Sequence, residues 1–203
     1  MDFKKHLETA WNLTLKHVVP LILMTLVSLA VSLLTIGVLG PVIMAGFIQS
    51  IILMMREERA PRIEDLFSQM RLFLPLLAFS IAVGLAVLVG AMFFILPGLA
   101  IALAVTFGCL YLLPLMTDRR MGLIEAVKTS WQMALQGSVA DHIVVVILFV
   151  GLMAVGGSVF FGILFTQPFA MVFLVSVYLE RIDTPPAGFA QAPPPPENTG
   201  PVS

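Results

Sequence analysis

Charge is scarce in this sequence. Asp, Glu, Lys and Arg make up 11% of the 203 residues and hydrophobic residues make up 59%, whereas soluble domains carry roughly 25% charged residues. Several apolar runs reach the roughly 18–20 residues that a helix needs to cross a bilayer. The runs are continuous rather than alternating, and in lipid only helices and closed barrels satisfy the backbone. The sequence therefore predicts an all-α, polytopic membrane protein.

Cysteine and the motifs of catalysis are also missing. Cys109 is the only cysteine, so no disulfide can form within the chain. There is no glycine-rich phosphate loop, no Gly-x-Ser-x-Gly elbow, no His-Glu-x-x-His pair and no cluster with metal-ligand spacing. No basic stripe supports nucleic-acid binding. We therefore expect a protein that is not an enzyme, uses no cofactor or metal and binds no nucleic acid.

The few charged residues are confined to alternate connections. Lys and Arg lie in the N-terminal segment, in two loops and after the last apolar run, and the acids share these segments. The other turns, near Gly40-Pro41, Pro97-Gly98 and Gly156–Gly162, contain no charged residue. Because positive residues favour the cytoplasmic side, both termini and both charged loops are predicted to be cytoplasmic.

The apolar runs predict six transmembrane helices, arranged as three hairpins within a domain of residues 1–182. The helices are expected at about residues 18–38, 41–55, 72–95, 98–116, 142–160 and 163–179. Pro168 marks either the turn before the last helix or a kink within it.

A segment with helical amphipathicity precedes each hairpin. The first, residues 2–17, places Trp11 at headgroup level, and residues 63–74 and 121–136 repeat the pattern. These segments predict cytoplasmic interfacial amphipathic helices. The likeness of the three units is positional, which is compatible with an internal repeat and with hydropathy alone.

Residues 183–203 have a different composition, rich in proline and nearly free of charge. Such a segment cannot bury enough apolar surface to fold, so we expect a disordered, Pro-rich cytoplasmic tail with polyproline II character. The tail is either a docking ligand for a protein partner or simply solvated.

Small residues recur at four-residue intervals in the third and fourth predicted helices, a spacing that favours close helix packing in lipid. This packing is either within the chain or along the seam of a homo-oligomer. The candidate helix-packing residues are Ala78, Ala82, Ala86, Gly90, Ala100, Ala104 and Gly108.

Polar groups within the predicted spans are few. No Asp, Glu, Lys or Arg lies in any of them, which argues against an ion-coupled pump. Gln49 is the notable intramembrane polar residue, and we expect its amide to hydrogen-bond to a neighbouring helix. Asp141 and His142 point about 100° apart on a helix and so form no dyad. Asp141 instead suits the start of a helix.

The arginines of the two charged loops allow two interpretations. They are either topology determinants or contacts for anionic lipid headgroups, whose attraction the neighbouring acids weaken. The candidate lipid-headgroup residues are Arg56, Arg59, Arg62, Arg119 and Arg120.

Part of the chain also resembles a known bacterial pattern. Its parts are Ile95-Leu96-Pro97-Gly98, an apolar run to Tyr111, Asp118, the segment Glu-Ala-Val-Lys-Thr-Ser at 125–130, Pro168-Phe169 and Tyr178. This pattern is similar to that of uncharacterised six-helix bacterial inner-membrane families, a group related to the membrane region of glycerophosphodiester phosphodiesterases. The resemblance implies a bacterial inner-membrane protein. The phosphodiesterase catalytic domain has no counterpart here, so that activity is not implied.

Together these features predict an integral inner-membrane protein without catalysis. It is expected to act as a scaffold or assembly component, or in envelope homeostasis, through contacts with membrane lipids or a protein partner. The alternative is a small oligomeric transporter or lipid-handling protein for a neutral or lipid-like solute, using polar residues of the first, second and sixth helices. An intramembrane enzyme is the third possibility.

Overall fold

The prediction of an all-α chain is confirmed. The computed structural model describes residues 2–93, 95–135, 138–157 and 162–183, which form helices and turns without any strand among them. The α-helices are α1 (Phe3–Lys16), α2 (Val18–Leu34), α3 (Gly40–Glu57), α4 (Phe73–Phe93), α5 (Ile95–Gly108), α6 (Leu112–Asp118), α7 (Leu123–Leu135), α8 (Val139–Gly157) and α9 (Gly162–Asp183), and the 3₁₀ helices η1 (Ile63–Phe67) and η2 (Met70–Leu72) precede α4.

Among the described residues, five segments are long and apolar enough to cross a membrane: Gly40–Glu57, Ile63–Met92, Leu96–Asp118, Val139–Gly157 and Gly162–Asp183. Helix α2 has 17 residues, about 26 Å of helix, which is short of a hydrocarbon core of about 30 Å. A sixth span is reached only if α1 and α2, which meet at a bend of 88°, count together. The chain thus has five or six helices suited to a membrane.

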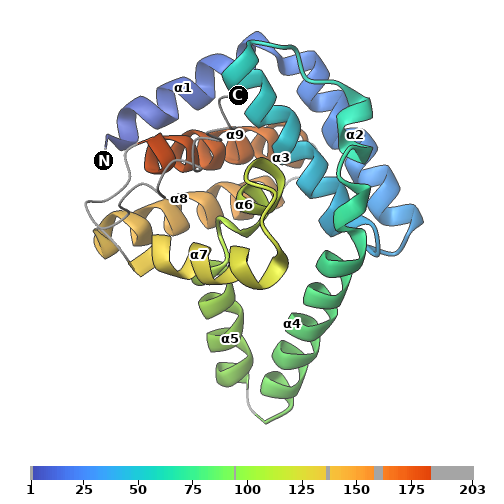
Figure 1. Ribbon diagram of the computed structural model, residues 1–203, viewed down its shortest axis with the longest axis vertical. Coiled ribbons are helices and arrows are strands. Elements are labelled where there is room, and N and C mark those ends of the chain that lie inside the picture. The colour runs from blue at the N-terminus through green and yellow to red at the C-terminus, as the bar shows by residue number, and fades with distance from the viewer. Residues whose placement is uncertain (1, 94, 136–137, 158–161, 184–203) are drawn as a thin grey trace, which may run out of the picture.

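Helices α3 and α9 form the centre of the fold. Their side chains supply much of the buried core, including Phe47, Ile51, Phe173 and Tyr178. In Figure 1, α8 lies beside α9, and α1 and α2 lie along the same central helices. The α4–α5 hairpin extends away from this centre, and most of its side chains are exposed.

Prolines determine where several helices begin. Pro20, Pro75, Pro97 and Pro114 each occupy the third position of a helix, in α2, α4, α5 and α6 respectively. The first four N–H groups of a helix have no intrahelical acceptor, so a proline there removes no hydrogen bond. A helix that continued from upstream would bring the proline ring against the carbonyl four residues earlier. This clash accounts for the break between α1 and α2 at His17.

The fourth predicted span, residues 98–116, lies within the membrane-length segment Leu96–Asp118, but it is two helices rather than one. The chain leaves the helix after Gly108 and resumes at Leu112, and α5 begins at Ile95, so that Pro97-Gly98 lies in its first turn. Pro114 has no N–H, so it cannot donate to the carbonyl of Leu110 as a helix would require. The amide of Tyr111, which lies in the break, donates to Ser130 Oγ of α7 at 3.3 Å.

Other expected boundaries also shift. The first span ends at Leu34 rather than 38, because Ile36 and Gly37 adopt positive φ in the turn that follows. Helices α3 and α9 extend beyond the expected 41–55 and 163–179, and Pro168 lies inside α9, which excludes the turn. Helix α8 begins at Val139 rather than 142; residues 158–160 of that prediction lie outside the described residues.

The predicted interfacial segments differ in kind. Residues 2–17 and 121–136 contain the amphipathic helices α1 and α7. The segment 63–74 forms two 3₁₀ helices followed by the start of α4, rather than one interfacial α-helix. Of the predicted tail, Asp183 belongs to α9, and residues 184–203 lie outside the described residues.

Candidate functional site

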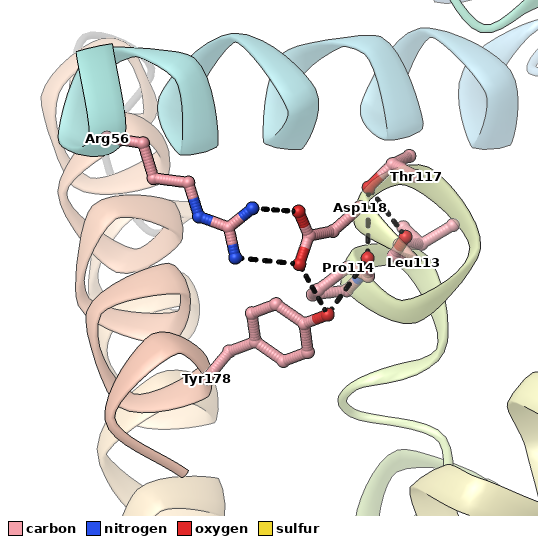
Figure 2. Close-up of polar contacts among 6 residues, drawn as sticks. All are labelled: Arg56, Leu113, Pro114, Thr117, Asp118 and Tyr178. Carbon is pink, nitrogen blue, oxygen red and sulfur yellow. Dashed lines mark hydrogen bonds and ion pairs between the residues drawn. The ribbon is translucent and has the colours of Figure 1, made fainter. Parts of the chain in front are cut away.

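The ends of three helices far apart in the sequence meet at one polar contact (Figure 2). Arg56 in the last turn of α3 donates two hydrogen bonds to Asp118, the last residue of α6, with Nη1···Oδ1 of 2.5 Å and Nη2···Oδ2 of 3.0 Å. The hydroxyl of Tyr178 in α9 lies 3.1 Å from Asp118 Oδ2 and 3.4 Å from the carbonyl oxygen of Pro114. We call Arg56, Asp118 and Tyr178 the helix-end clamp.

The clamp has the features of a strong polar contact. A guanidinium bound to a carboxylate through two parallel hydrogen bonds has a fixed orientation. The Asp118 side chain is 6% exposed and that of Arg56 is 45% exposed, so water screens the pair only from one side. Tyr178 is fully buried, and within the described residues the acceptors found for its hydroxyl all lie on α6. The clamp therefore fixes the positions of α3, α6 and α9 relative to one another.

A second buried cluster adjoins the clamp. His142 Nε2 lies 2.8 Å from the carbonyl oxygen of Phe107, and its Nδ1 lies 3.5 Å from the Tyr111 hydroxyl. Because a carbonyl oxygen only accepts, Nε2 carries the proton in the neutral ring and Nδ1 is left as the acceptor. The rings of Tyr111 and Tyr178 have centroids 6.3 Å apart, which joins the cluster to the clamp.

Arg181 closes this second cluster. Its guanidinium carbon lies 5.4 Å from the centroid of the Tyr111 ring, a cation–π distance, and its Nη1 donates to the Met133 carbonyl oxygen at 2.7 Å. One side chain of α9 thus binds the last turn of α7 and the break between α5 and α6. Each polar side chain of the two clusters has its partner within the chain, so the clusters stabilise the fold.

A third polar contact attaches the first charged loop to α3. Asp65 Oδ2 accepts from Ser50 Oγ and from Arg59 Nη2, both at 2.7 Å. The backbone approaches closely here, because a Cβ built on Gly46 would lie 2.2 Å from the carbonyl oxygen of Leu66. Only glycine leaves room for η1 against α3 at this point.

The five candidate arginines separate into two groups. Arg56 and Arg59 are engaged by Asp118 and Asp65. Arg62, Arg119 and Arg120 are exposed, and no ion pair is found for them within the described part of the chain. The loops that carry these three are fastened to α3 by the acids that engage the other two.

Large apolar side chains are exposed on or next to the segments that carry Arg62, Arg119 and Arg120. On and beside η1 these are Ile63, Phe67 and Met70, each 40–42% exposed. On α7, which follows Arg120, Ile124 is 72% and Trp131 is 37% exposed. Cationic and apolar side chains are therefore exposed side by side in sequence.

Gln49 does not make the expected hydrogen bond through its carbonyl oxygen. Oε1 is buried, and no donor is found for it among the described residues. In the interior of α3 a lone acceptor of this kind is costly.

The candidate helix-packing residues fall into two groups, glycines that are buried and alanines that are exposed. Gly90 is buried against Gly98, and Gly108 is buried against the ring of Trp131, so both pack within the chain. The alanines are exposed in the described chain, so whether they pack along the seam of a homo-oligomer stays a prediction. These are Ala78, Ala82, Ala86, Ala100 and Ala104.

Sequence reasoning missed the association of Tyr111, His142, Tyr178 and Arg181. One signal was present: Tyr111, Asp118, Ser130 and Tyr178 all belong to the pattern on which the family resemblance rests, and the structure brings them to the two adjoining clusters. Asp141 lies in the first turn of α8, as expected. Within the described ranges, no three His, Cys, Asp or Glu side chains come together as a metal site requires.

Comparison with known proteins adds no relative. No protein-family model matches the chain, and neither a curated protein nor a solved structure matches it.

Proposed function

We propose that the chain is an integral protein of the bacterial inner membrane that acts without catalysis, as a scaffold or assembly component or in envelope homeostasis. It contacts anionic lipids, or a protein partner, at its cytoplasmic face. The observation that carries the proposal is the exposure of Arg62, Arg119 and Arg120 beside exposed apolar side chains, while the remaining two loop arginines are engaged within the chain.

The helix-end clamp supports the proposed orientation. It gathers the C-terminal ends of α3, α6 and α9. Three helices that all run inward would end on the same side, next to the charged loops. The positive-inside rule predicts that this arginine-bearing side is cytoplasmic, where the membrane surface is anionic.

Exposed arginine beside exposed apolar residues suits a membrane surface better than bulk water. The apolar side chains enter the acyl boundary, and the guanidinium groups bind phosphate. Each basic residue near an anionic surface contributes about 1 kcal/mol. The exposed Glu57 and Glu58 nearby reduce this field. We therefore expect the three arginines together to change affinity for anionic lipid about tenfold.

The test counts lipids retained by the protein. The full chain is reconstituted with equal amounts of phosphatidylglycerol and phosphatidylcholine, extracted in mild detergent and examined by native mass spectrometry. The wild type is expected to retain phosphatidylglycerol preferentially, and Arg62→Gln/Arg119→Gln/Arg120→Gln to lose the preference. The control, Lys5→Gln/Lys16→Gln, removes two exposed positive charges on α1, outside the proposed surface. If both variants lose the preference for phosphatidylglycerol equally, the preference depends on net charge alone and the proposal is wrong.

Gln49 supports a second candidate, a small oligomeric transporter or lipid-handling protein for a neutral or lipid-like solute. Its unbonded Oε1 is an acceptor that a donor on such a solute satisfies. Other polar groups of these helices give less support, since Thr25 and Ser28 in α2 donate to carbonyls of their own helix. Solute flux in proteoliposomes that falls in Gln49→Leu would favour transport over scaffolding.

A further inference from the structure

A shallow groove of about 490 Å³ runs between α1 and α9. It is lined by Lys4, Leu7, Glu8, Trp11, Asn12 and Phe169. Its floor is apolar, and its charged side chains both come from one face of α1. Neither the helix-end clamp nor the exposed arginines contribute to it.

Contacts between α1 and α9 on either side of the groove fix the positions of its walls. The Trp11 ring meets the rings of Phe165 and Phe169 edge to face, with centroids 5.8 and 6.2 Å apart. His6, which is 3% exposed, fastens α1 to α9 through Nδ1, 2.7 Å from Ser176 Oγ. Its Nε2 lies 2.8 Å from Glu180 Oε2.

The rim of the groove carries one positive and one negative charge. Lys4 Nζ lies 3.7 Å from Glu8 Oε1, and the two side chains are 85% and 63% exposed. Exposed pairs at i and i+4 are common on helices, and they contribute little to stability because water screens them. Both groups therefore remain available to a ligand that brings the opposite charges.

We infer that this groove binds a zwitterionic aminophospholipid, of the phosphatidylethanolamine class. An acyl chain lies along Leu7, Trp11 and Phe169, the lipid phosphate pairs with Lys4, and the lipid ammonium donates to Glu8. A choline headgroup has no N–H to donate to Glu8, and a glycerol headgroup brings no positive charge to it. The inference rests on the proposed function only in placing α1 at the membrane interface, where tryptophan is favoured.

Tryptophan fluorescence tests the inference directly. Full-length Trp131→Phe leaves Trp11 as the only tryptophan, and Trp11→Phe leaves Trp131 as the matched control. Each is reconstituted in phosphatidylcholine with a small fraction of brominated lipid bearing an ethanolamine, choline or glycerol headgroup. Brominated phosphatidylethanolamine is expected to quench Trp11 with about fivefold higher apparent affinity than the other two, the effect of one exposed ion pair. Trp131 is expected to show no headgroup preference.

Two substitutions identify the groups responsible. Glu8→Gln is expected to abolish the preference for ethanolamine over choline, and Lys4→Gln to weaken quenching by all three phospholipids. Because Trp131→Phe changes the contact with Gly108, the wild type is tested as well, by counting retained phosphatidylethanolamine in native mass spectra with and without Glu8→Gln.

The outcomes separate the inference from the proposed function. Equal quenching of Trp11 by all three lipids overturns the aminophospholipid site while leaving a membrane protein in place. If neither tryptophan is quenched by any lipid, both proposals fail. If Trp11 is quenched only after residues 184–203 are removed, the chain's own tail occupies the groove and the lipid assignment is wrong.

Discussion

The hydroxyl of Tyr178 donates to the carboxylate of Asp118 across 60 residues of sequence, at an O···O distance of 3.1 Å. The same carboxylate also accepts hydrogen bonds from both terminal nitrogens of Arg56. One carboxylate thereby joins α3, α6 and α9, and the charged ends of these helices become a single unit rather than three separate loops.

The first prediction concerns the strength of this unit. Asp118→Ala removes the only ion-pair partner found for Arg56 in the described chain and one acceptor of the buried Tyr178 hydroxyl. We expect the free energy of unfolding to fall by about 1–3 kcal/mol, measured by denaturation in detergent micelles.

Arg56→Ala leaves the nearly buried carboxylate without its cation, and a similar loss is expected. The double variant Arg56→Ala/Asp118→Ala should lose less than the sum of the two, because both changes remove one interaction. Arg119→Ala is the control and should have no effect. Additive losses in the double variant would mean that the pair does not act as one contact.

Hydropathy predicted the course of the helices well where one physical cause dominates. The expected third span, 72–95, corresponds to α4 within two residues at each end, because an apolar run in that length range has few other ways to satisfy its backbone. The amphipathic segment 2–17 likewise contains α1, with Asp2 Oδ1 accepting from the Lys5 amide at its start.

Hydropathy did not predict features that depend on partners distant in sequence. The break at residues 109–111 lies in an apolar run without any hydropathic boundary. It depends on Pro114 and on Ser130, which takes the Tyr111 amide. Four of the five candidate arginines lie between helices as expected, whereas Arg56 lies in the last turn of α3. Nothing local indicates that Arg56 meets Asp118, 62 residues later, while Arg119 stays exposed.

The second prediction concerns the close approach of η1 to α3. Gly46→Ala places a Cβ 2.2 Å from the Leu66 carbonyl oxygen, which belongs to backbone and cannot rotate away. We expect a loss of about 1–3 kcal/mol in the free energy of unfolding. Gly84→Ala is a matched control within α4, where the new Cβ meets nothing within 4 Å.

Gly84→Ala should instead be neutral or raise stability by up to about 1 kcal/mol, since alanine favours the helix. If both glycine variants behave alike, the contact between η1 and α3 is not tight in solution.

The third prediction separates packing within the hairpin from packing between copies. Gly90→Leu is expected to destabilise the α4–α5 hairpin, because a Cβ at this position already lies 3.0 Å from Gly98 backbone atoms. Ala82→Leu/Ala86→Leu changes exposed positions and should leave the unfolding of the isolated chain unchanged.

Size measurement in detergent then decides the role of the exposed alanines. If they form a homo-oligomer seam, the double leucine variant dissociates while Gly90→Leu affects the unfolding transition. If the double leucine variant keeps both its size and its stability, these alanines face lipid alone and the seam is excluded.

The fourth prediction concerns the side of the membrane on which the clamp lies. In a Cys109→Ala background, single cysteines at Arg119 and Ser203 should react with a membrane-impermeant thiol reagent only when it is supplied from the cytoplasmic side. A cysteine at Val38, in the uncharged turn between α2 and α3, should react only from the other side. The physical reason is that the charged segments cannot cross the hydrocarbon core without large cost, whereas the turn at Val38 carries no charge. Labelling of Arg119→Cys and Ser203→Cys from opposite sides would require an odd number of crossings between them, and α8 and α9 could not then both span the membrane.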